Sequence, residues 1–250
     1  MAERVTWLST VTNSSWSALS FWLSASWNLN HVGCGAYLGT PMSFRGMDVR
    51  AIKEVLVDRE YAFALDRLAG VASPVILDVG AHIGLFALWL LKAIPDARVQ
   101  SIEADPQTYA VLLSNIADAR TDCVKWDALH AAAWGKDGDV IRFSSAGLSM
   151  SHRVSRGGDV LVEGITLKRL LDGLVGETGT VDLLKVDIEG SEEAFLCATP
   201  ALLKRVRNLV VELHPYLCDT GRVEKVLRDC YGTVEEVRDR SSSKPLLMCY

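Results

Sequence analysis

Residues 75–84 read VILDVGAHIG, and this stretch decides the fold class. The run from Val75 to Val79 is short, apolar and followed by a glycine, which is typical of a strand buried on both faces. A helix is expected from Gly84 to about Ala93, before the helix-breaking Pro95. A buried strand joined to a helix by a tight glycine turn begins a unit of parallel sheet, so the stretch predicts an α/β fold.

The same alternation of strands and helices continues to the end of the chain. Further strands are expected at 98–103, near 124, at 131–134, 140–143, 181–187 and 208–213, and as a closing pair at 233–238 and 245–250. Helices are expected at 105–117, 166–171, 191–198 and 223–230, and a surface loop at 144–158. This alternation predicts a doubly wound, mostly parallel sheet.

The chain is expected to divide near Pro74. Helical patterns cover residues 6–30 and the stretch from Val49 to Leu68, and the glycines near residues 33–39 interrupt them. We therefore expect an N-terminal helical extension over residues 1–73 and the main domain over residues 74–250.

Tryptophan is concentrated in the first part of this extension. Four of the 7 tryptophans lie there, namely Trp7, Trp16, Trp22 and Trp27. Three of them share one helical face, which needs a partner. The alternatives are packing against the sheet, a homodimer contact through the N-terminal region, and a lid over the substrate.

Composition excludes several classes of protein. The 250 residues carry 26 Lys and Arg against 31 Asp and Glu, a net charge of −5, which disfavours a nucleic-acid-binding surface. No apolar run approaches the about 18–20 residues of a membrane span. The 6 cysteines are scattered, and the first residues do not resemble a signal peptide, so we expect a cytoplasmic protein with reduced thiols.

The glycine turn is the first candidate site. In doubly wound sheets, ligands bind at the carboxyl ends of the strands, where this turn lies. His82 stands where a dinucleotide-binding turn has its second glycine, so a pyrophosphate ligand is not favoured. Asp78, just before the turn, suits a cationic group. Glu103 ends the next strand, where a carboxylate accepts hydrogen bonds from ribose hydroxyls.

A second group of polar residues lies at the ends of two later strands. Residues 185–192 read KVDIEGSE, in which Lys185 and Asp187 share a strand face and Glu189 lies just beyond. His214 ends the next strand, beside Glu212, and is expected to face the same crevice. A histidine near several carboxylates is a candidate for proton transfer.

Five segments together resemble one known family. They are ILDVGAHIG (76–84), SIEADP (101–106), ITLKRLLD (165–172), VDLLKVDIEGSE (181–192) and VVELHP (210–215). The pattern resembles the FkbM-type S-adenosylmethionine-dependent methyltransferases. The resemblance implies a Rossmann-like class I fold with a seven-stranded sheet. The cofactor-binding residues it implies are Asp78, Gly80, Ala81, His82, Gly84, Glu103, Ala104, Asp127, Ala132 and Trp134.

The resemblance also implies the chemistry. We expect O-methylation of a hydroxyl on a small molecule, sugar or natural product, with N-methylation as an alternative. Asp187 or His214 would take the proton, and Glu189 and Lys185 would shape the site; His152 is a weaker candidate for the base. A divalent cation held by Asp187, Glu189, Glu212 and His214 is chemically possible but not favoured.

Two other functions stay open at this stage. One is a nicotinamide-dependent oxidoreductase on a similar sheet, against which the missing central glycine counts. The other is a non-catalytic nucleotide-binding protein, in which the acidic residues near 187–214 would be idle. Titration with S-adenosylhomocysteine and with NAD separates the first of these from a methyltransferase.

Overall fold

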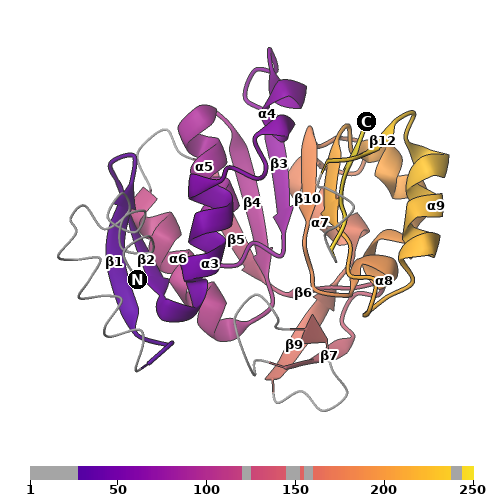
Figure 1. Cartoon of the computed structure of the whole chain (residues 1–250). Coiled ribbons are helices and arrows are strands. Elements are labelled where there is room, and N and C mark those ends of the chain that lie inside the picture. Colours follow the sequence, from indigo (N-terminus) through magenta and orange to yellow (C-terminus); the bar gives the residue numbers. More distant parts are fainter. Residues whose placement is uncertain (1–27, 120–124, 145–152, 155–159, 238–243) are drawn as a thin grey trace.

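The centre of the molecule is a seven-stranded sheet in the order β12-β13-β11-β10-β3-β4-β5 (Figure 1). The computed structural model describes residues 28–119, 125–144, 153–154, 160–237 and 244–250. The strands are β3 (Val75–Val79), β4 (Arg98–Glu103), β5 (Lys125–His130), β10 (Leu183–Val186), β11 (Leu209–Glu212), β12 (Val234–Glu236) and β13 (Leu246–Cys249). β13 is antiparallel to both neighbours, and the other six strands run parallel. The expected doubly wound, mostly parallel sheet is confirmed.

The strand order reverses between β3 and β10. From β3 the chain builds β4 and β5 on one side, and it later returns to place β10 on the other side, with Asp78 opposite Lys185. Ligands of doubly wound sheets bind at the carboxyl edge beside such a reversal, because the flanking connections diverge there and leave a crevice. The topology therefore places the site where β3 and β10 end.

Helices cover both faces of the sheet. One face carries α5 (Leu85–Ala93) and α6 (Pro106–Ala119); the other carries α7 (Leu167–Val175), α8 (Glu192–Leu196), a 3-10 segment (Pro200–Arg205) and α9 (Thr220–Cys230). Side chains of β3 alternate between the two cores, with Ile76 in one and Leu77 and Val79 in the other. Burial on both faces explains why this strand is a continuous apolar run.

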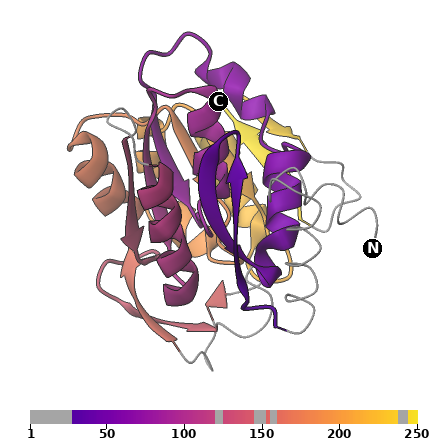
Figure 2. The same cartoon turned by 90° about the vertical axis from the view of Figure 1, so that its left-hand side faces the viewer.

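A β-hairpin lies where the sequence predicted only a break between helices. β1 (Val32–Tyr37) pairs antiparallel with β2 (Thr40–Arg45). The two residues between them, Leu38 and Gly39, have φ of 46° and 83°. Positive φ at both turn positions matches the twist of a two-residue hairpin, so the glycine here makes a turn. The prediction of a helical extension over residues 1–73 does not hold for this segment, which Figure 2 shows in indigo.

The hairpin and the helices after it share a core with the main domain. The next elements are η1 (Gly46–Asp48), α3 (Val49–Ile52), a π-helical turn η2 (Lys53–Val57) and α4 (Phe63–Leu68), so the helix expected over 49–68 is interrupted. Met42 and Phe44 are buried in the same cluster as α5 and α6. Asn115 of α6 holds Ser43 by hydrogen bonds at both backbone groups, of 2.6 and 3.1 Å. No gap in packing marks the expected boundary at residue 74 in the described part of the chain.

Several predictions fall outside the described residues. Residues 6–27 of the helix expected over 6–30, its four tryptophans and His152 all lie there, whereas residues 29 and 30 are described and form a turn. The roles suggested for the first segment, a lid or a homodimer contact, therefore stay predictions.

A small second sheet follows β5. It has the order β6-β9-β7-β8, formed by β6 (Ala132–Ala133), β7 (Val140–Ser144), β8 (Arg153–Val154) and β9 (Val160–Ile165). β9 was not expected from the sequence. The chain between β5 and β6 passes the carboxyl edge of the main sheet, so residues 131–133 reach the site. Within the described ranges, no helix has the length and apolar character that crossing a membrane requires.

Candidate active site

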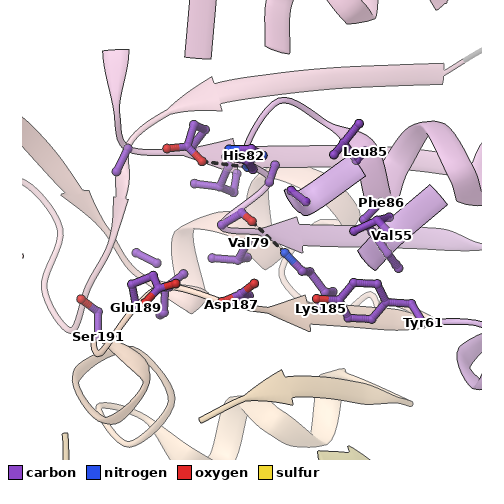
Figure 3. Close-up of a pocket in the computed structure, with 18 of the residues that line it drawn as sticks. Val55, Tyr61, Val79, His82, Leu85, Phe86, Lys185, Asp187, Glu189 and Ser191 are labelled. Atoms are coloured by element: carbon purple, nitrogen blue, oxygen red, sulfur yellow. Dashed lines mark hydrogen bonds between the residues drawn. The ribbon is translucent and has the colours of Figure 1, made fainter. Parts of the chain in front are cut away.

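A single cavity lies at the carboxyl ends of β3 and β10, with about 950 Å³ of empty space that includes its open mouth (Figure 3). Of the residues predicted from the sequence, the cavity is lined by Gly80, Ala81, His82, Glu103, Ala104, Ala132, Lys185, Asp187 and Glu189. Five residues predicted for the site do not line it: Asp78, Gly84, Asp127, Trp134 and His214.

The turn after β3 is shaped by two glycines with different neighbours. Gly80 has φ of 78°, and a Cβ atom there would lie 1.7 Å from the backbone oxygen of Asp187. The loop after β10 therefore approaches the turn too closely for any side chain. Gly84 has φ of 87°, and its Cβ would lie 2.5 Å from the Trp126 ring. Gly84 thus packs beneath the turn and does not line the cavity, so its predicted contact with a cofactor stays a prediction.

Glu103 points its carboxylate into the cavity from the end of β4. Its two oxygens each accept one backbone hydrogen bond of 2.8 Å, Oε2 from His82 and Oε1 from Asp105. Burial raises the pKa of this carboxyl group. A carboxylate oxygen accepts more than one hydrogen bond, so both oxygens retain capacity for the hydroxyls of a ribose.

Asp78 and Lys185 form a buried pair behind the turn. Lys185 Nζ lies 3.4 Å from Asp78 Oδ1 and donates a 2.7 Å hydrogen bond to the backbone oxygen of Gly80. Burial alone would lower the pKa of Lys185, but the charges of Asp78 and Asp187 outweigh it and raise that pKa. Asp78 thus supports the turn through Lys185. The resemblance placed Asp78 near the cofactor ammonium. Its side chain is fully buried and does not line the cavity, so that placement stays a prediction.

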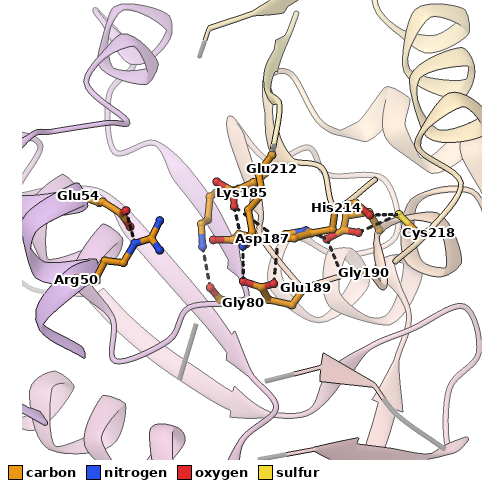
Figure 4. Close-up of polar contacts among 12 residues, drawn as sticks. Arg50, Glu54, Gly80, Lys185, Asp187, Glu189, Gly190, Glu212, His214 and Cys218 are labelled. Carbon is orange, nitrogen blue, oxygen red and sulfur yellow. Dashed lines mark hydrogen bonds and ion pairs between the residues drawn. The ribbon is translucent and has the colours of Figure 1, made fainter. Parts of the chain in front are cut away.

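His214 is enclosed by carboxylates (Figure 4). Its Nδ1 lies 2.7 Å from Glu192, and its Nε2 lies 3.1 Å from Glu189, 3.6 Å from Glu212 and 4.0 Å from Asp187. Burial alone would lower the pKa of His214, but hydrogen bonds to Glu189 and Glu192 and the charge of Asp187 raise it to about 10. The ring is therefore an imidazolium at neutral pH. It also does not line the cavity, so this arrangement does not favour His214 as the general base, and that role stays a prediction.

Asp187, Glu212 and His214 place one ligand atom each within 4.8 Å of one another, a spacing that could hold a metal ion. A metal ligand has to be a neutral imidazole, whereas Nδ1 of His214 lies 2.7 Å from Glu192 and its Nε2 lies 3.1 Å from Glu189, an arrangement of charge pairs. Lys244 Nζ lies 3.4 Å from Glu212 and 2.9 Å from Glu189, so a cation already neutralises these groups. The donor set fits an ion-pair network better than a metal.

Asp127 and Trp134 lie away from the cavity because of where β5 ends. Asp127 pairs in register with Gln100, whereas the last residue of β5, His130, pairs with Glu103. Asp127 is thus exposed along the strand, below its carboxyl end. Trp134 packs with the small sheet, against the cluster that contains Ile141 and Val162. The residues that reach the cavity from this region are Ala131, Ala132 and Ala133.

The N-terminal segment supplies a wall that no motif in the sequence indicated. Ala51, Glu54, Val55, Glu60 and Tyr61 line the cavity from α3, η2 and the following turn. The apolar stripe predicted for 49–68 is a general feature of packed helices, so it gave no functional signal. Figure 3 shows Val55 and Tyr61 close to Phe86 of α5, which makes this side of the cavity largely apolar.

The model of the FkbM methyltransferase domain matches residues 78–231 of the chain. The chain belongs to the FkbM methyltransferase family. This assignment confirms the resemblance, and with it S-adenosylmethionine-dependent methyl transfer as the class of activity. The matched region contains the glycine turn, Glu103, Asp187 and His214, and it leaves out the hairpin and the helices that form the apolar wall.

Three relatives of this family member are similar over different extents. Methyltransferase sdnD of Sordaria araneosa is 28% identical over 225 residues, covering 77% of the chain and 84% of sdnD. Hexuronic acid methyltransferase AglP of Haloferax volcanii is 27% identical over 162 residues, 64% of each protein. The AMB antimetabolite synthetase AmbE of Pseudomonas aeruginosa is 28% identical over 204 residues, and the matched region is 9% of its length.

Solved structures match this chain only at low identity and with TM-scores below 0.5. The magnesium protoporphyrin IX methyltransferase of Synechocystis, solved with bound S-adenosylmethionine, has a TM-score of 0.47 at 12% identity, covering 90% of this chain and 89% of that one. Precorrin-6y C5,15-methyltransferase of Geobacter metallireducens has a TM-score of 0.45 at 16% identity, covering 75% and 83%.

Proposed function

We propose that this family member transfers a methyl group from S-adenosylmethionine to a hydroxyl oxygen of a small molecule or sugar. The observation that carries the proposal is the joint lining of one cavity by the turn at Gly80–His82, the Glu103 carboxylate and the Asp187 carboxylate. The turn suits the amino-acid end of the cofactor, and the Glu103 carboxylate suits its ribose. The third supplies a proton acceptor in the same space.

The cofactor would lie along the carboxyl edge of the sheet. Its ribose hydroxyls would donate to Glu103, and its amino-acid end would lie over the exposed backbone of Gly80 and Ala81. The adenine would approach the small side chains of Ala104 and Ala132. The bound cofactor supplies an electrophilic methyl group. The protein contributes alignment of the acceptor with that methyl, which is worth about 7–11 kcal/mol of the barrier in well-oriented reactions.

Asp187 is the proposed proton acceptor. It lines the cavity, and its backbone N–H donates a 3.0 Å hydrogen bond to the oxygen of Val79, which fixes the start of its loop. A positioned base typically contributes about 10²–10⁴-fold to the rate. Glu189 and His214 would then hold this loop through their 3.1 Å contact. Lys185 would support it from below.

The acceptor would enter between Asp187 and the apolar wall. Val55, Leu85 and Phe86 face this part of the cavity. Such a mixture suits an acceptor that offers one apolar face and one hydroxyl-bearing edge, as many sugars and natural products do. AglP is a relative that acts on hexuronic acid, which is consistent with a sugar acceptor. Transfer to nitrogen is the alternative outcome.

Binding and turnover are tested separately. We expect isothermal titration calorimetry to show binding of S-adenosylhomocysteine and none of NAD. Formation of S-adenosylhomocysteine from S-adenosylmethionine, measured over a panel of glycosides and amines, identifies the acceptor class. Asp187→Asn should keep the dissociation constant and lower turnover about 10²–10⁴-fold.

The matched control is Glu193→Gln, an acidic residue of the same region that pairs with Arg222 and does not line the cavity. It should leave binding and turnover unchanged. Binding of NAD in place of S-adenosylhomocysteine would favour an oxidoreductase. Cofactor binding without turnover on the whole panel would favour a non-catalytic protein.

A further inference from the structure

Asp48 is a fully buried carboxylate outside the region that matches the family. It ends the 3-10 turn after the hairpin, and Arg45 holds it from three sides: the backbone N–H and Nε donate to Oδ2 at 2.8 and 2.9 Å, and Nη2 donates to Oδ1 at 2.9 Å. Its Oδ1 also lies 3.1 Å from Nε2 of His82. Burial alone would raise the pKa of Asp48, but the hydrogen bonds from His82 and Arg45 hold it far below its usual range.

His82 sits at the centre of the cofactor turn in an unusual conformation. Its φ is 55°, in the left-handed region, which is strained for a residue other than glycine. A residue keeps such a conformation when its surroundings hold it there. Asp48 holds the ring of His82, and Glu103 accepts the 2.8 Å hydrogen bond from its backbone N–H.

The same contacts continue to the start of α6. Arg45 Nη2 donates a 3.0 Å hydrogen bond to Thr108 Oγ1, and Thr108 donates from its backbone and its hydroxyl to Asp105 Oδ2. Asp105 in turn donates its backbone N–H to Glu103. Arg45 and Asp48 thereby connect to both backbone groups that orient the Glu103 carboxylate.

We propose that Asp48 is a positioning residue for the cofactor: it holds His82 in the left-handed turn and so orients Glu103 for the ribose. The inference rests on the proposed function, since it assumes that this cavity takes S-adenosylmethionine. It makes the hairpin segment a part of the cofactor site, although the segment lies before the family domain. The competing explanation is that Asp48 only attaches this segment to the rest of the domain and has no effect on the cofactor site.

A double-mutant cycle in the full chain distinguishes the positioning role of Asp48 from a purely structural one. Asp48→Asn and His82→Asn should each weaken binding of S-adenosylhomocysteine about tenfold, because each removes a hydrogen bond with a charged partner. The double variant should be no weaker than either single variant within about threefold, because both remove the same contact. Asp58→Asn is the matched control: an exposed acidic residue of the same segment, paired with Lys53, that should bind like the wild type.

His82→Asn leaves the Arg45–Asp48 pair intact and places a residue that tolerates the left-handed region, so this variant reports on the contact without uncovering a buried charge. Binding within about twofold of the wild type in both single variants, or effects that multiply in the double variant, would overturn the inference. A loss of stability in Asp48→Asn with unchanged affinity for S-adenosylhomocysteine would also overturn it, because that result is expected if Asp48 only attaches the segment to the domain.

Amide hydrogen exchange measured without cofactor tests the positioning role of Asp48 independently of the proposed function. Asp48→Asn should speed exchange at residues 80–84, and Asp58→Asn should not. Unchanged exchange at the turn contradicts the positioning role. A wild type that fails to bind S-adenosylhomocysteine contradicts the proposed function instead, whatever the exchange shows.

Discussion

The Nδ1 atom of His214 lies 2.7 Å from Oε1 of Glu192, and the two side chains are 2% and 0% exposed. The same Glu192 oxygen accepts a 3.0 Å hydrogen bond from the backbone of Gly190, and its other oxygen accepts one of 3.2 Å from the thiol of Cys218. Burial alone would raise the pKa of Glu192, but the hydrogen bonds from His214 and Gly190 lower it. The two side chains therefore form an ion pair, which links the segment after β10 to the segment after β11.

Replacing Glu192 by glutamine should be destabilising. Glu192→Gln keeps the shape but removes the charge opposite a buried imidazolium, so we expect a loss of about 1.5–3 kcal/mol in the free energy of unfolding at pH 7. Urea denaturation measures it. Glu193→Gln, on the exposed side of the same helix, should stay within about 1 kcal/mol of the wild type. Equal effects of the two variants would contradict the buried pair.

The stability of the protein should depend on the protonation of His214. Its pKa in the folded state is about 10, above the 6.5 of an ordinary histidine, so the folded protein binds this proton more tightly than the unfolded chain. The resulting stabilisation is fully present below pH about 6.5 and is lost as the pH rises towards 10. Between pH 6.5 and 9.5, the wild type should lose more unfolding free energy than His214→Gln. Parallel pH profiles would show that the ring is not held as a cation.

Two glycines with nearly the same φ allow the cost of backbone strain to be separated from the cost of a close contact with another part of the chain. Gly80 and Gly70 have φ of 78° and 79°, but a Cβ at Gly70 would have no atom within 4 Å. Gly70→Ala should cost about 1–2 kcal/mol of stability through strain and leave cofactor binding intact. Gly80→Ala should in addition displace the turn or the Asp187 loop, and weaken S-adenosylhomocysteine binding tenfold or more. Calorimetry on both variants checks this, and similar affinities would contradict the close approach.

The hairpin should contribute to the stability of the whole domain. Phe44 is 0% exposed in the core shared with α5 and α6, so Phe44→Ala should lower the unfolding free energy by about 3–5 kcal/mol. Leu38→Ala, at the hairpin turn where the side chain is 68% exposed, should change it by less than about 0.5 kcal/mol. A single unfolding transition is expected for both variants. A separate early transition in Phe44→Ala would show that the segment unfolds on its own.

Metal removal tests the ion-pair network. Because Lys244 and His214 already neutralise Glu189 and Glu212, turnover should survive exhaustive dialysis against EDTA within about twofold. Steady-state turnover before and after dialysis measures this. A loss that Mg²⁺ or Mn²⁺ restores would instead make Asp187, Glu212 and His214 metal ligands.

The sequence allowed the sheet and the polar residues at its carboxyl edge to be predicted, but not the wall of the cavity that the N-terminal segment supplies. Apolar runs such as Val75–Val79 mark buried strands, and residues that follow parallel strands meet at one edge, so Gly80, Glu103 and Asp187 could be brought together without coordinates. Asp127 was predicted to approach the adenine but does not line the cavity, because that depends on where β5 ends. Strand register sets that point, and a short strand in a half-exposed edge position carries little pattern to reveal it.

The sequence by itself determined the family, the order of elements and the residue types at the strand ends, because these depend on local patterns of burial and turn formation. Only the tertiary structure decided what those residues do to one another. His214 was an apparent base until four carboxylates surrounded it and raised its pKa to about 10. Asp48 had no visible role until folding placed it 3.1 Å from His82. Protonation and orientation depend on which charges are neighbours in space and on how far water is excluded, and neither is written in the spacing along the chain.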